Sequence, residues 1–155
     1  MRPSELLDPA DLLLDFQPTD KWQAIGDLVH HLVALGKLPA EFEGPVRDAV
    51  LDRERSMSTG MERGVAVPHA AVEGVTELLA VMGVVQDGSG LDFESIDGQG
   101  ARVVVLLVIP KGQKLLHIRT LADIARVLTK ESVRAKLMET RDQAEAHAVL
   151  VAGEA

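Results

Sequence analysis

The sequence predicts a single α/β domain, residues 1–155, in which a central mixed β-sheet is covered by helices on both faces. Three observations carry this prediction. Strand-like and helix-like segments are mixed along the whole chain, which is typical of a sheet packed against helices. The run 103–109 is continuously apolar, as expected for a strand that is buried on both sides. The chain also has the length of one domain and contains no repeat, low-complexity tract or linker.

The first third of the chain predicts one strand and two helices. Leu12, Leu13, Leu14 and Phe16 form a short apolar segment that suits a strand, and Pro18 closes it. Thr19 and Asp20 are good residues for a helix N-cap, and Gly36 suits the end of that helix. Its expected buried stripe consists of Trp22, Ile25, Val29 and Leu32. A second helix is expected over about 45–55, with Val46, Ala49 and Val50 facing inward.

The rest of the chain is also predicted to contain both strands and helices. Residues 56–71 read as a loop that contains a short strand, 65–67, and strands are expected at 78–85 and 102–109. A helix follows, with an expected apolar stripe of Leu115, Ile118, Leu121, Ala122, Ala125 and Leu128. Two closing helices are expected over 132–138 and 142–150.

Composition excludes several classes of function. The formal charge of −8 argues against binding nucleic acid and favours basic protein partners. Cysteine is absent, which excludes disulfides, thiol catalysis and cysteine-based zinc sites. The first ten residues lack the apolar core of a signal peptide, and the run 103–109 is too short for membrane insertion. We therefore expect a cytoplasmic protein.

The most informative segment is the short apolar strand 65–67 with Pro68 and His69 directly after it. Proline fixes its own φ and holds the preceding residue extended, so it stiffens the point where the histidine is displayed. A neutral imidazole at pH 7 is a suitable nucleophile or general base. Taken alone, a histidine in a loop is more often a plain surface residue.

A second histidine, His117, is expected in the first turn of the helix that follows the central strand. Sites in open α/β sheets form where strand ends meet helix starts, and a helix start favours anions. From its position alone, His117 is more simply a boundary residue that packs partly on its helix.

These residues form a pattern that resembles the enzyme IIA domains of the bacterial sugar phosphotransferase system, in the fructose, mannitol and nitrogen-related branch. The first matching block contains Arg53-Glu54, then Ser58-Thr59-Gly60, then the run from Gly64 to His69. The second block contains the acidic segment 93–99, the strand 103–110 and the helix start at 117–121. The resemblance extends from about Ser4 to Leu150.

The resemblance implies a role for four residues and for several partners. His69 would be the phosphorylated histidine, His117 would stabilise the phosphoryl group, and Arg53 would bind its oxygens, with help from Thr59. No metal and no cofactor are implied. The phosphoryl donor would be the histidine phosphocarrier protein, and the acceptor would be an enzyme IIB domain or a regulated protein. Such a chain is a phosphotransferase component.

The sequence departs from the family pattern in two places, and other functions stay open. Ala70 and Ala71 follow the histidine where a basic or hydroxyl residue is common, and Glu62 and Arg63 replace smaller residues. A non-phosphorylated regulatory binding module of the same fold is therefore an alternative. A hydrolase with His69 as its base is disfavoured, because no cysteine or G-x-S-x-G serine is present.

The sequence ends near Ala155 with no IIB or IIC region attached. This favours a stand-alone regulatory form, while a separate transporter subunit stays open. The sequence indicates neither a sugar nor an oligomeric state.

Overall fold

The computed structural model describes residues 2–88 and 90–155, which form one mixed sheet with helices on both faces. The strand order is β1-β4-β5-β2, and β3 also pairs with β5. β4 runs antiparallel to β5, whereas β2 and β3 run parallel to β5, and β1 runs parallel to β4. The predicted mixed sheet is confirmed. The strands are β1 (Leu12–Leu13), β2 (Val65–Ala66), β3 (His69–Val72), β4 (Leu79–Val84) and β5 (Val103–Pro110).

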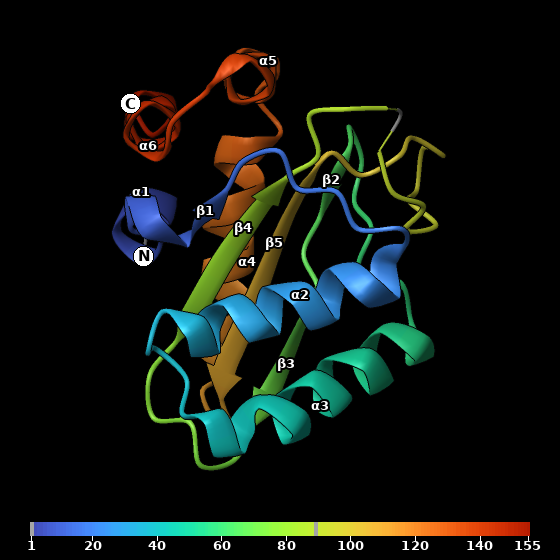
Figure 1. The fold of residues 1–155 in the computed structure, drawn as a ribbon, viewed down its shortest axis with the longest axis vertical. Helices are drawn as coiled ribbons and strands as arrows, with labels where there is room; N and C mark the ends of the chain where they lie inside the picture. Colours follow the sequence, from blue (N-terminus) through green and yellow to red (C-terminus); the bar gives the residue numbers. More distant parts are fainter. Residues whose placement is uncertain (1, 89) are drawn as a thin grey trace.

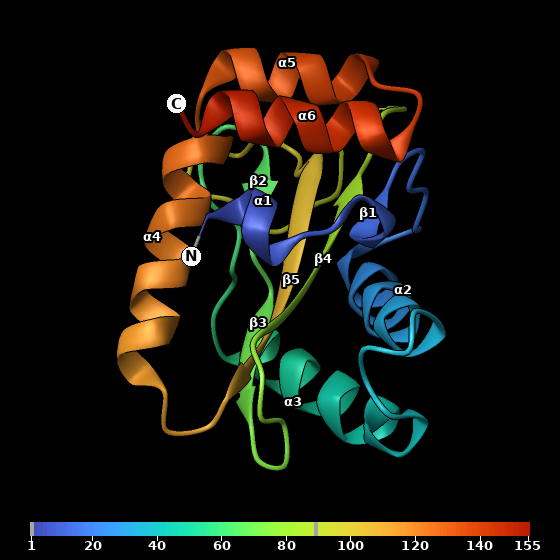
Figure 2. The same cartoon turned by 90° about the vertical axis from the view of Figure 1, so that its left-hand side faces the viewer.

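The helices divide between the two faces of the sheet. In Figures 1 and 2, α2 and α3 cover one face, and α1, α4, α5 and α6 cover the other. Two short 3-10 turns, η1 (Pro9–Asp11) and η2 (Ala40–Phe42), precede β1 and α3. The helices are α1 (Pro3–Leu6), α2 (Lys21–Ala34), α3 (Glu43–Ser56), α4 (Lys114–Leu128), α5 (Glu131–Glu139) and α6 (Gln143–Gly153).

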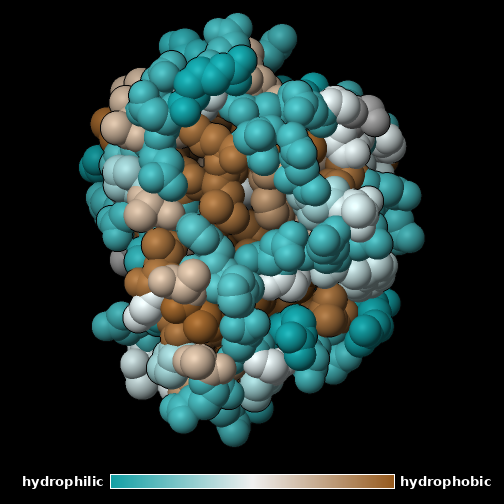
Figure 3. Space-filling model, viewed as in Figure 1, coloured by the Kyte–Doolittle hydropathy of each residue, from teal (hydrophilic) through white to brown (hydrophobic). Residues whose placement is uncertain are grey.

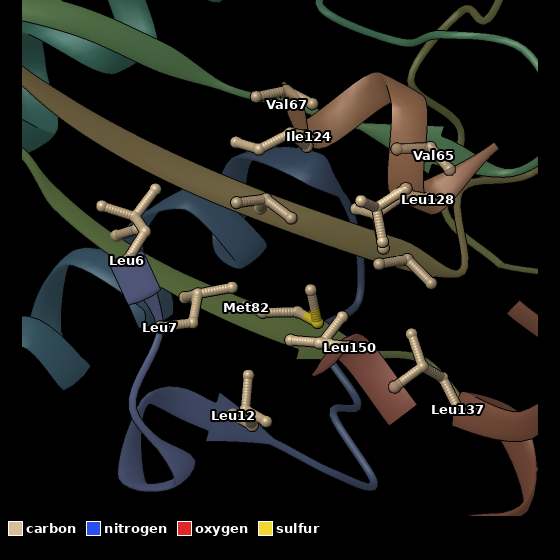
Figure 4. Close-up of a cluster of buried hydrophobic side chains, with 14 of the residues drawn as sticks. Leu6, Leu7, Leu12, Val65, Val67, Met82, Ile124, Leu128, Leu137 and Leu150 are labelled. Carbon is tan, nitrogen blue, oxygen red and sulfur yellow. The ribbon is translucent and has the colours of Figure 1, made fainter. Parts of the chain in front are cut away.

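The central strand β5 contributes to two separate hydrophobic cores. All eight of its residues are buried, as the continuous apolar run predicts. Because successive side chains of a strand point to opposite faces, Val105 and Leu107 pack under α4 and α6, whereas Val104 and Leu106 pack under α2 and α3. Figure 4 shows the first core, in which Met82 and Leu150 meet side chains from both ends of the chain.

Trp22 does not belong to the buried stripe of α2, contrary to the sequence prediction. Its side chain is 39% exposed, whereas Ile25, Val29 and Leu32 are fully buried as expected. The indole lies beside two cations, with Lys21 Nζ 4.8 Å and the Arg55 guanidinium carbon 5.9 Å from its ring. An amphipathic ring that faces cations loses little by staying at the surface.

The apolar stripe predicted for α4 is also wrong in part. Leu115 and Ile118 are 61% and 56% exposed, and Ala122 is exposed too. At 100° per residue these three positions share one side of the helix. The residues that pack on the sheet lie on the other side: Thr120, Ile124, Val127 and Leu128.

Two predicted strands differ from the observed ones. β1 ends at Leu13 because Asp15 takes a left-handed conformation, with φ 55°, although Phe16 N still donates to Val84 O. The segment after β2 is a second strand, β3, which starts at His69 and was predicted as loop. Pro68 has no N–H to extend the ladder, so it separates the two strands, but its carbonyl accepts from Leu107 N.

The predicted helix ends are confirmed where the caps are specific. The Asp20 side chain accepts a hydrogen bond from Gln23 N at 2.8 Å and so caps α2. Gly36 has φ 76° just past the end of that helix, a conformation that glycine adopts at little cost. The closing helices α5 and α6 also lie where the sequence predicts them.

Most of the molecular face drawn in Figure 3 is hydrophilic. In the view of Figure 3, hydrophobic side chains gather in a recess between α2 and the α5–α6 layer, and hydrophilic side chains surround it. In the described part of the chain, no helix has both the length and the apolar composition needed to cross a membrane.

Candidate functional site

His69 is held rigidly at the start of β3. Its backbone pairs in register with Leu107 of the central strand, and its side chain is only 7% exposed. The ring nitrogen Nδ1 lies 2.7 Å from the carbonyl oxygen of Val67. A carbonyl oxygen only accepts hydrogen bonds, so Nδ1 carries the proton and Nε2 keeps its lone pair. The predicted stiffness of the Val67-Pro68-His69 segment thus has a specific result, which is a fixed ring orientation and tautomer.

His117 lies next to His69 although it is far away in the sequence. It stands one turn into α4, which follows β5 after a short loop. The two imidazole rings are 4.8 Å apart between centroids and meet edge to face at 69°. The structure therefore brings together the two histidines that the sequence singled out. A cavity of about 210 Å³ lies beside His117, between Ala71, Pro110 and Lys114.

The surroundings of both histidines favour their neutral forms. Burial lowers the pKa of His69, and the charges of His117 and Arg53 lower it further, against the opposing effects of the Val67 carbonyl and Glu54. Burial also lowers the pKa of His117, with a second contribution from Arg53. At pH 7 both imidazoles are therefore neutral, so each ring has one N–H donor and one nitrogen with a free lone pair.

Arg53 contributes a positive charge to the site. It lies in the last turn of α3, and its charge acts on both histidines. Its Nη1 donates a 2.8 Å hydrogen bond to Met57 O, which holds the guanidinium at the end of the helix. A guanidinium has five N–H donors, so this bond leaves others for an anion. The charge of Arg53 thus acts on both histidines, while its role in binding phosphoryl oxygens stays a prediction.

Thr59 lies in the same region, but its hydroxyl group is already used. Its Oγ1 donates to Glu54 Oε1 at 2.5 Å, and its backbone N–H donates to Glu54 Oε2 at 3.0 Å. Its carbonyl oxygen accepts from the backbone N–H of Val67, the residue whose own carbonyl holds the His69 ring. In this geometry Thr59 links Glu54 to the histidine strand and positions the site.

Glu54 and Lys21 are the residues that the sequence analysis did not assign. The Glu54 side chain is fully buried, and Lys21 Nζ lies 3.3 Å from its Oε2. The spacing of Glu54 and Lys21 from apolar residues of their helices could have predicted that both are buried. Glu54 follows Val46 and Val50 at intervals of four residues, and Lys21 precedes Ile25 in the same way, so both fall on buried helix faces. A charge on a buried face needs a partner, and each supplies the other.

The segment after Thr59 requires a glycine at position 60. A Cβ at this position would lie 2.7 Å from the backbone oxygen of Phe93, too close for any side chain. The Ser58 hydroxyl donates to the same carbonyl oxygen. This close contact fixes the loop that carries Thr59 against the segment around Phe93.

Two histidines and one arginine are thus the chemical groups of the site. Among residues 2–88 and 90–155, no three metal-ligating side chains are grouped as a metal ion would need. The set of donors suits an anion that lies between the two imidazoles and the guanidinium.

Comparison with known proteins gives the same family from the whole sequence. The profile of the family described as "Phosphoenolpyruvate-dependent sugar phosphotransferase system, EIIA 2" matches residues 5–152. The chain is 30% identical over 147 residues to a nitrogen regulatory protein of Bradyrhizobium diazoefficiens, covering 95% of this chain and 93% of that protein. It is 31% identical over 143 residues to the fructose-specific EIIABC component of Bacillus subtilis, covering 92% of this chain but only 22% of that protein.

Solved structures share the fold. Mannitol IIA of Escherichia coli superposes with a TM-score of 0.76 at 27% identity, covering 93% of this chain and 98% of that one. Nitrogen regulatory protein IIA-Ntr of Neisseria meningitidis superposes with a TM-score of 0.83 at 24% identity, covering 95% and 97%. With the profile match over nearly the entire chain, these findings show that the protein belongs to the EIIA 2 family of the phosphoenolpyruvate-dependent sugar phosphotransferase system.

Proposed function

We propose that Nε2 of His69 accepts a phosphoryl group from the histidine phosphocarrier protein and passes it to an enzyme IIB domain or holds it as a regulatory signal. The hydrogen bond from His69 Nδ1 to Val67 O carries this proposal. It leaves Nε2 as the nitrogen with the free lone pair, and it persists after transfer because Nδ1 keeps its proton.

The transfer balances without any further reactant. The Nε2 lone pair of His69 forms the new P–N bond, while the P–N bond to the donor breaks and its electron pair stays on the donor imidazole. No proton has to move to or from His69 in this step. In this proposal the N–H of His117 and the guanidinium of Arg53 meet the charge on the three phosphoryl oxygens, supported by the 4.8 Å between the two imidazole centroids and by the effect of the Arg53 charge on His69.

The surface around the histidines suits a protein donor better than a small one. Met57, Leu115 and Ile118 are among the large hydrophobic side chains that stay exposed. Met57 accepts the Arg53 hydrogen bond through its carbonyl, and the other two flank His117 in the sequence of α4. Exposed apolar side chains around a buried nucleophile are typical of a docking surface.

A IIB domain is the acceptor that the relatives support. One structural neighbour is the complex of enzyme IIA mannitol with phosphorylated enzyme IIB mannitol of Escherichia coli, with a TM-score of 0.72 at 21% identity. The relative from Bradyrhizobium is a nitrogen regulatory protein, which supports the second role, a regulatory signal.

Phosphorylation by purified components tests the proposal. The protein is incubated with phosphoenolpyruvate, enzyme I and the histidine phosphocarrier protein, and intact mass spectrometry detects an added phosphoryl group. His69→Ala is expected to abolish the adduct, and His117→Ala to slow its formation by about 100-fold or more. His30→Ala, which changes an exposed histidine of α2, is the matched control and is expected to behave like the unmodified protein.

An adduct that survives in His69→Ala would overturn the assignment of the nucleophile. If no adduct forms with a phosphocarrier of proven activity, the protein is instead a non-phosphorylated binding module of this fold. Loss of the adduct at low pH, with retention at high pH, identifies it as a phosphohistidine.

A further inference from the structure

We propose a second anion site, separate from His69, in which Arg63, Arg102 and Arg134 bind a small phosphomonoester. The three arginines line a cavity of about 250 Å³, together with Glu131 and apolar surface from Val103 and Met138. The cavity lies between the start of β5, the turn before β2 and one face of α5. Nothing in the proposed function of His69 depends on it.

Backbone hydrogen bonds hold each of these arginines in place. Arg63 Nη1 donates to Thr129 O at 3.1 Å, and Arg134 Nη1 donates to Leu128 O at 3.1 Å. Arg102 donates through Nε to Val85 O and through Nη2 to Gln86 O. These bonds use only some of the five N–H donors of each group, so the rest are available to a ligand.

The charge of the cavity is unusual for this protein. Three guanidinium groups and one carboxylate line it, an excess of two positive charges in a chain whose formal charge is −8. Within the described part of the chain, none of the three guanidinium groups lies within ion-pair distance of a carboxylate. The positive charge is therefore not neutralised by a direct ion pair.

These properties select the class of ligand. A phosphomonoester carries about 1.5 to 2 negative charges at pH 7, which matches the excess charge of the cavity. Arginine forks are suited to phosphate oxygens. The volume is just below the usual range for small-molecule sites, and the apolar wall at Val103 and Met138 suits a short organic body.

Arg63 has an unusual backbone conformation. It has φ 62°, a left-handed conformation that is uncommon for a residue other than glycine. Its backbone N–H donates to Asp97 Oδ2 at 2.8 Å, which holds the turn while the side chain reaches the end of α4 beside the cavity. Arg63 is also one of the positions where the sequence departs from the family pattern.

The cavity is at the other end of α4 from the histidines. His117 stands in the first turns of α4, whereas Leu128 and Thr129, which accept from the arginines, are at its C-terminal end. Leu128 lies eleven positions after His117, a distance of about 16 Å along the helix. Figure 2 shows α4 running from the end of the molecule with the β5 terminus to the end with α5.

NMR titration of the full chain with glycerol 3-phosphate tests the site. Saturable shifts are expected for the arginine Nε–H signals and for the backbone amides of Gly64 and Val103, whereas glycerol causes none. In Arg63→Gln/Arg134→Gln the dissociation constant is expected to rise about tenfold or more. Arg141→Gln removes an exposed arginine outside the cavity and is expected to bind as the unmodified protein does. Inorganic phosphate, titrated in parallel, separates recognition of the phosphate from recognition of the organic body.

The absence of saturable shifts up to about 10 mM of either phosphate would overturn the proposal. So would equal weakening in Arg141→Gln, which would indicate a general charge effect, or shifts that centre on His69. The variants at Arg63 and Arg134 avoid Arg102, whose bonds to Val85 and Gln86 support the fold. The amide spectrum of each variant, recorded without ligand, shows whether it is folded.

Discussion

His69 combines a buried ring with the nucleophilic role proposed for it, and the pH dependence expected for its phosphorylation follows from its surroundings. Burial, His117 and Arg53 keep its pKa below the ordinary value of 6.5. Protonation of Nε2 would remove the attacking lone pair, so the single-turnover rate of phosphorylation is expected to fall with pH only below 6.5. The rate measured against pH, with an NMR titration of the His69 ring, checks this expectation.

The lowered pKa of His69 also makes the stability of the folded protein depend on pH. The unfolded chain takes up the proton first as pH falls, so the contribution of His69 to stability is present above pH 6.5 and is lost as pH falls through its folded pKa. Arg53→Gln removes one of the charges that lower this pKa, and the titration midpoint of His69 is expected to move upward. A midpoint at or above 6.5 in the unmodified protein would contradict the account.

Glu54 is the residue whose loss should cost most stability around the site. Glu54→Gln leaves Lys21 buried without its carboxylate, and we expect the free energy of unfolding to fall by about 3 kcal/mol. Urea denaturation measures this change. Glu139→Gln, at an exposed position of α5, is the matched control and should change it by less than about 0.5 kcal/mol.

A second variant separates the ion pair from the shape of the side chains. In Lys21→Met/Glu54→Gln the buried cation is gone and the introduced amide oxygen can still accept from Thr59, so most of the lost stability should return. Equal destabilisation in the single and double variants would mean that the carboxylate acts through Thr59 alone.

At the scale of the elements, two helical glycines should respond in opposite directions to alanine. Gly26 lies within α2 and a Cβ there would meet only Arg47 Cδ at 3.9 Å, so Gly26→Ala is expected to stabilise by about 0.5–1 kcal/mol. Gly153 ends α6 and a Cβ there would lie 2.5 Å from Val133 Cγ2, so Gly153→Ala is expected to destabilise by about 1–3 kcal/mol. Thermal unfolding of the two variants beside the unmodified protein measures both changes, and a common sign would refute the packing argument.

The elements also show where sequence patterns fail. The longer helices, α2 to α6, were predictable from spacing and caps, because those signals are local, whereas the single turn of α1 was missed. The buried face of α4 was predicted only in part, since Leu115 and Ile118 are apolar but lie at the surface. β3 was missed because Pro68 interrupts an extended segment whose pairing with β5 depends on a partner far along the chain.

At the scale of the whole molecule, β5 joins the two helical layers. Its alternate side chains enter both cores, so neither layer can lose its packing without exposing the same strand. The continuous apolar run made this arrangement predictable from the sequence. The proximity of His69 to His117 was predictable only roughly, from the rule that sites lie where strands end and helices start.

Two features of the whole molecule depend on contacts that no local pattern contains. The link from Glu54 to Thr59 joins a helix to a loop, and only the folded chain shows that the Thr59 hydroxyl is used there. The three arginines of the second cavity come from three separate segments, and they meet only because α4 ends beside β2 and β5. In the sequence alone, Arg63 is recognisable only as a departure from the family pattern.

The position of Trp22 gives the protein an optical probe of its own. The chain has one tryptophan and no tyrosine, so ultraviolet excitation reaches a single indole. That indole lies 4.8 Å from Lys21 Nζ, and Lys21 is bonded to the carboxylate that also holds Thr59 beside the histidine strand. Because a nearby cation shifts the emission of an indole, the fluorescence of the unlabelled protein reports on the same network that positions His69.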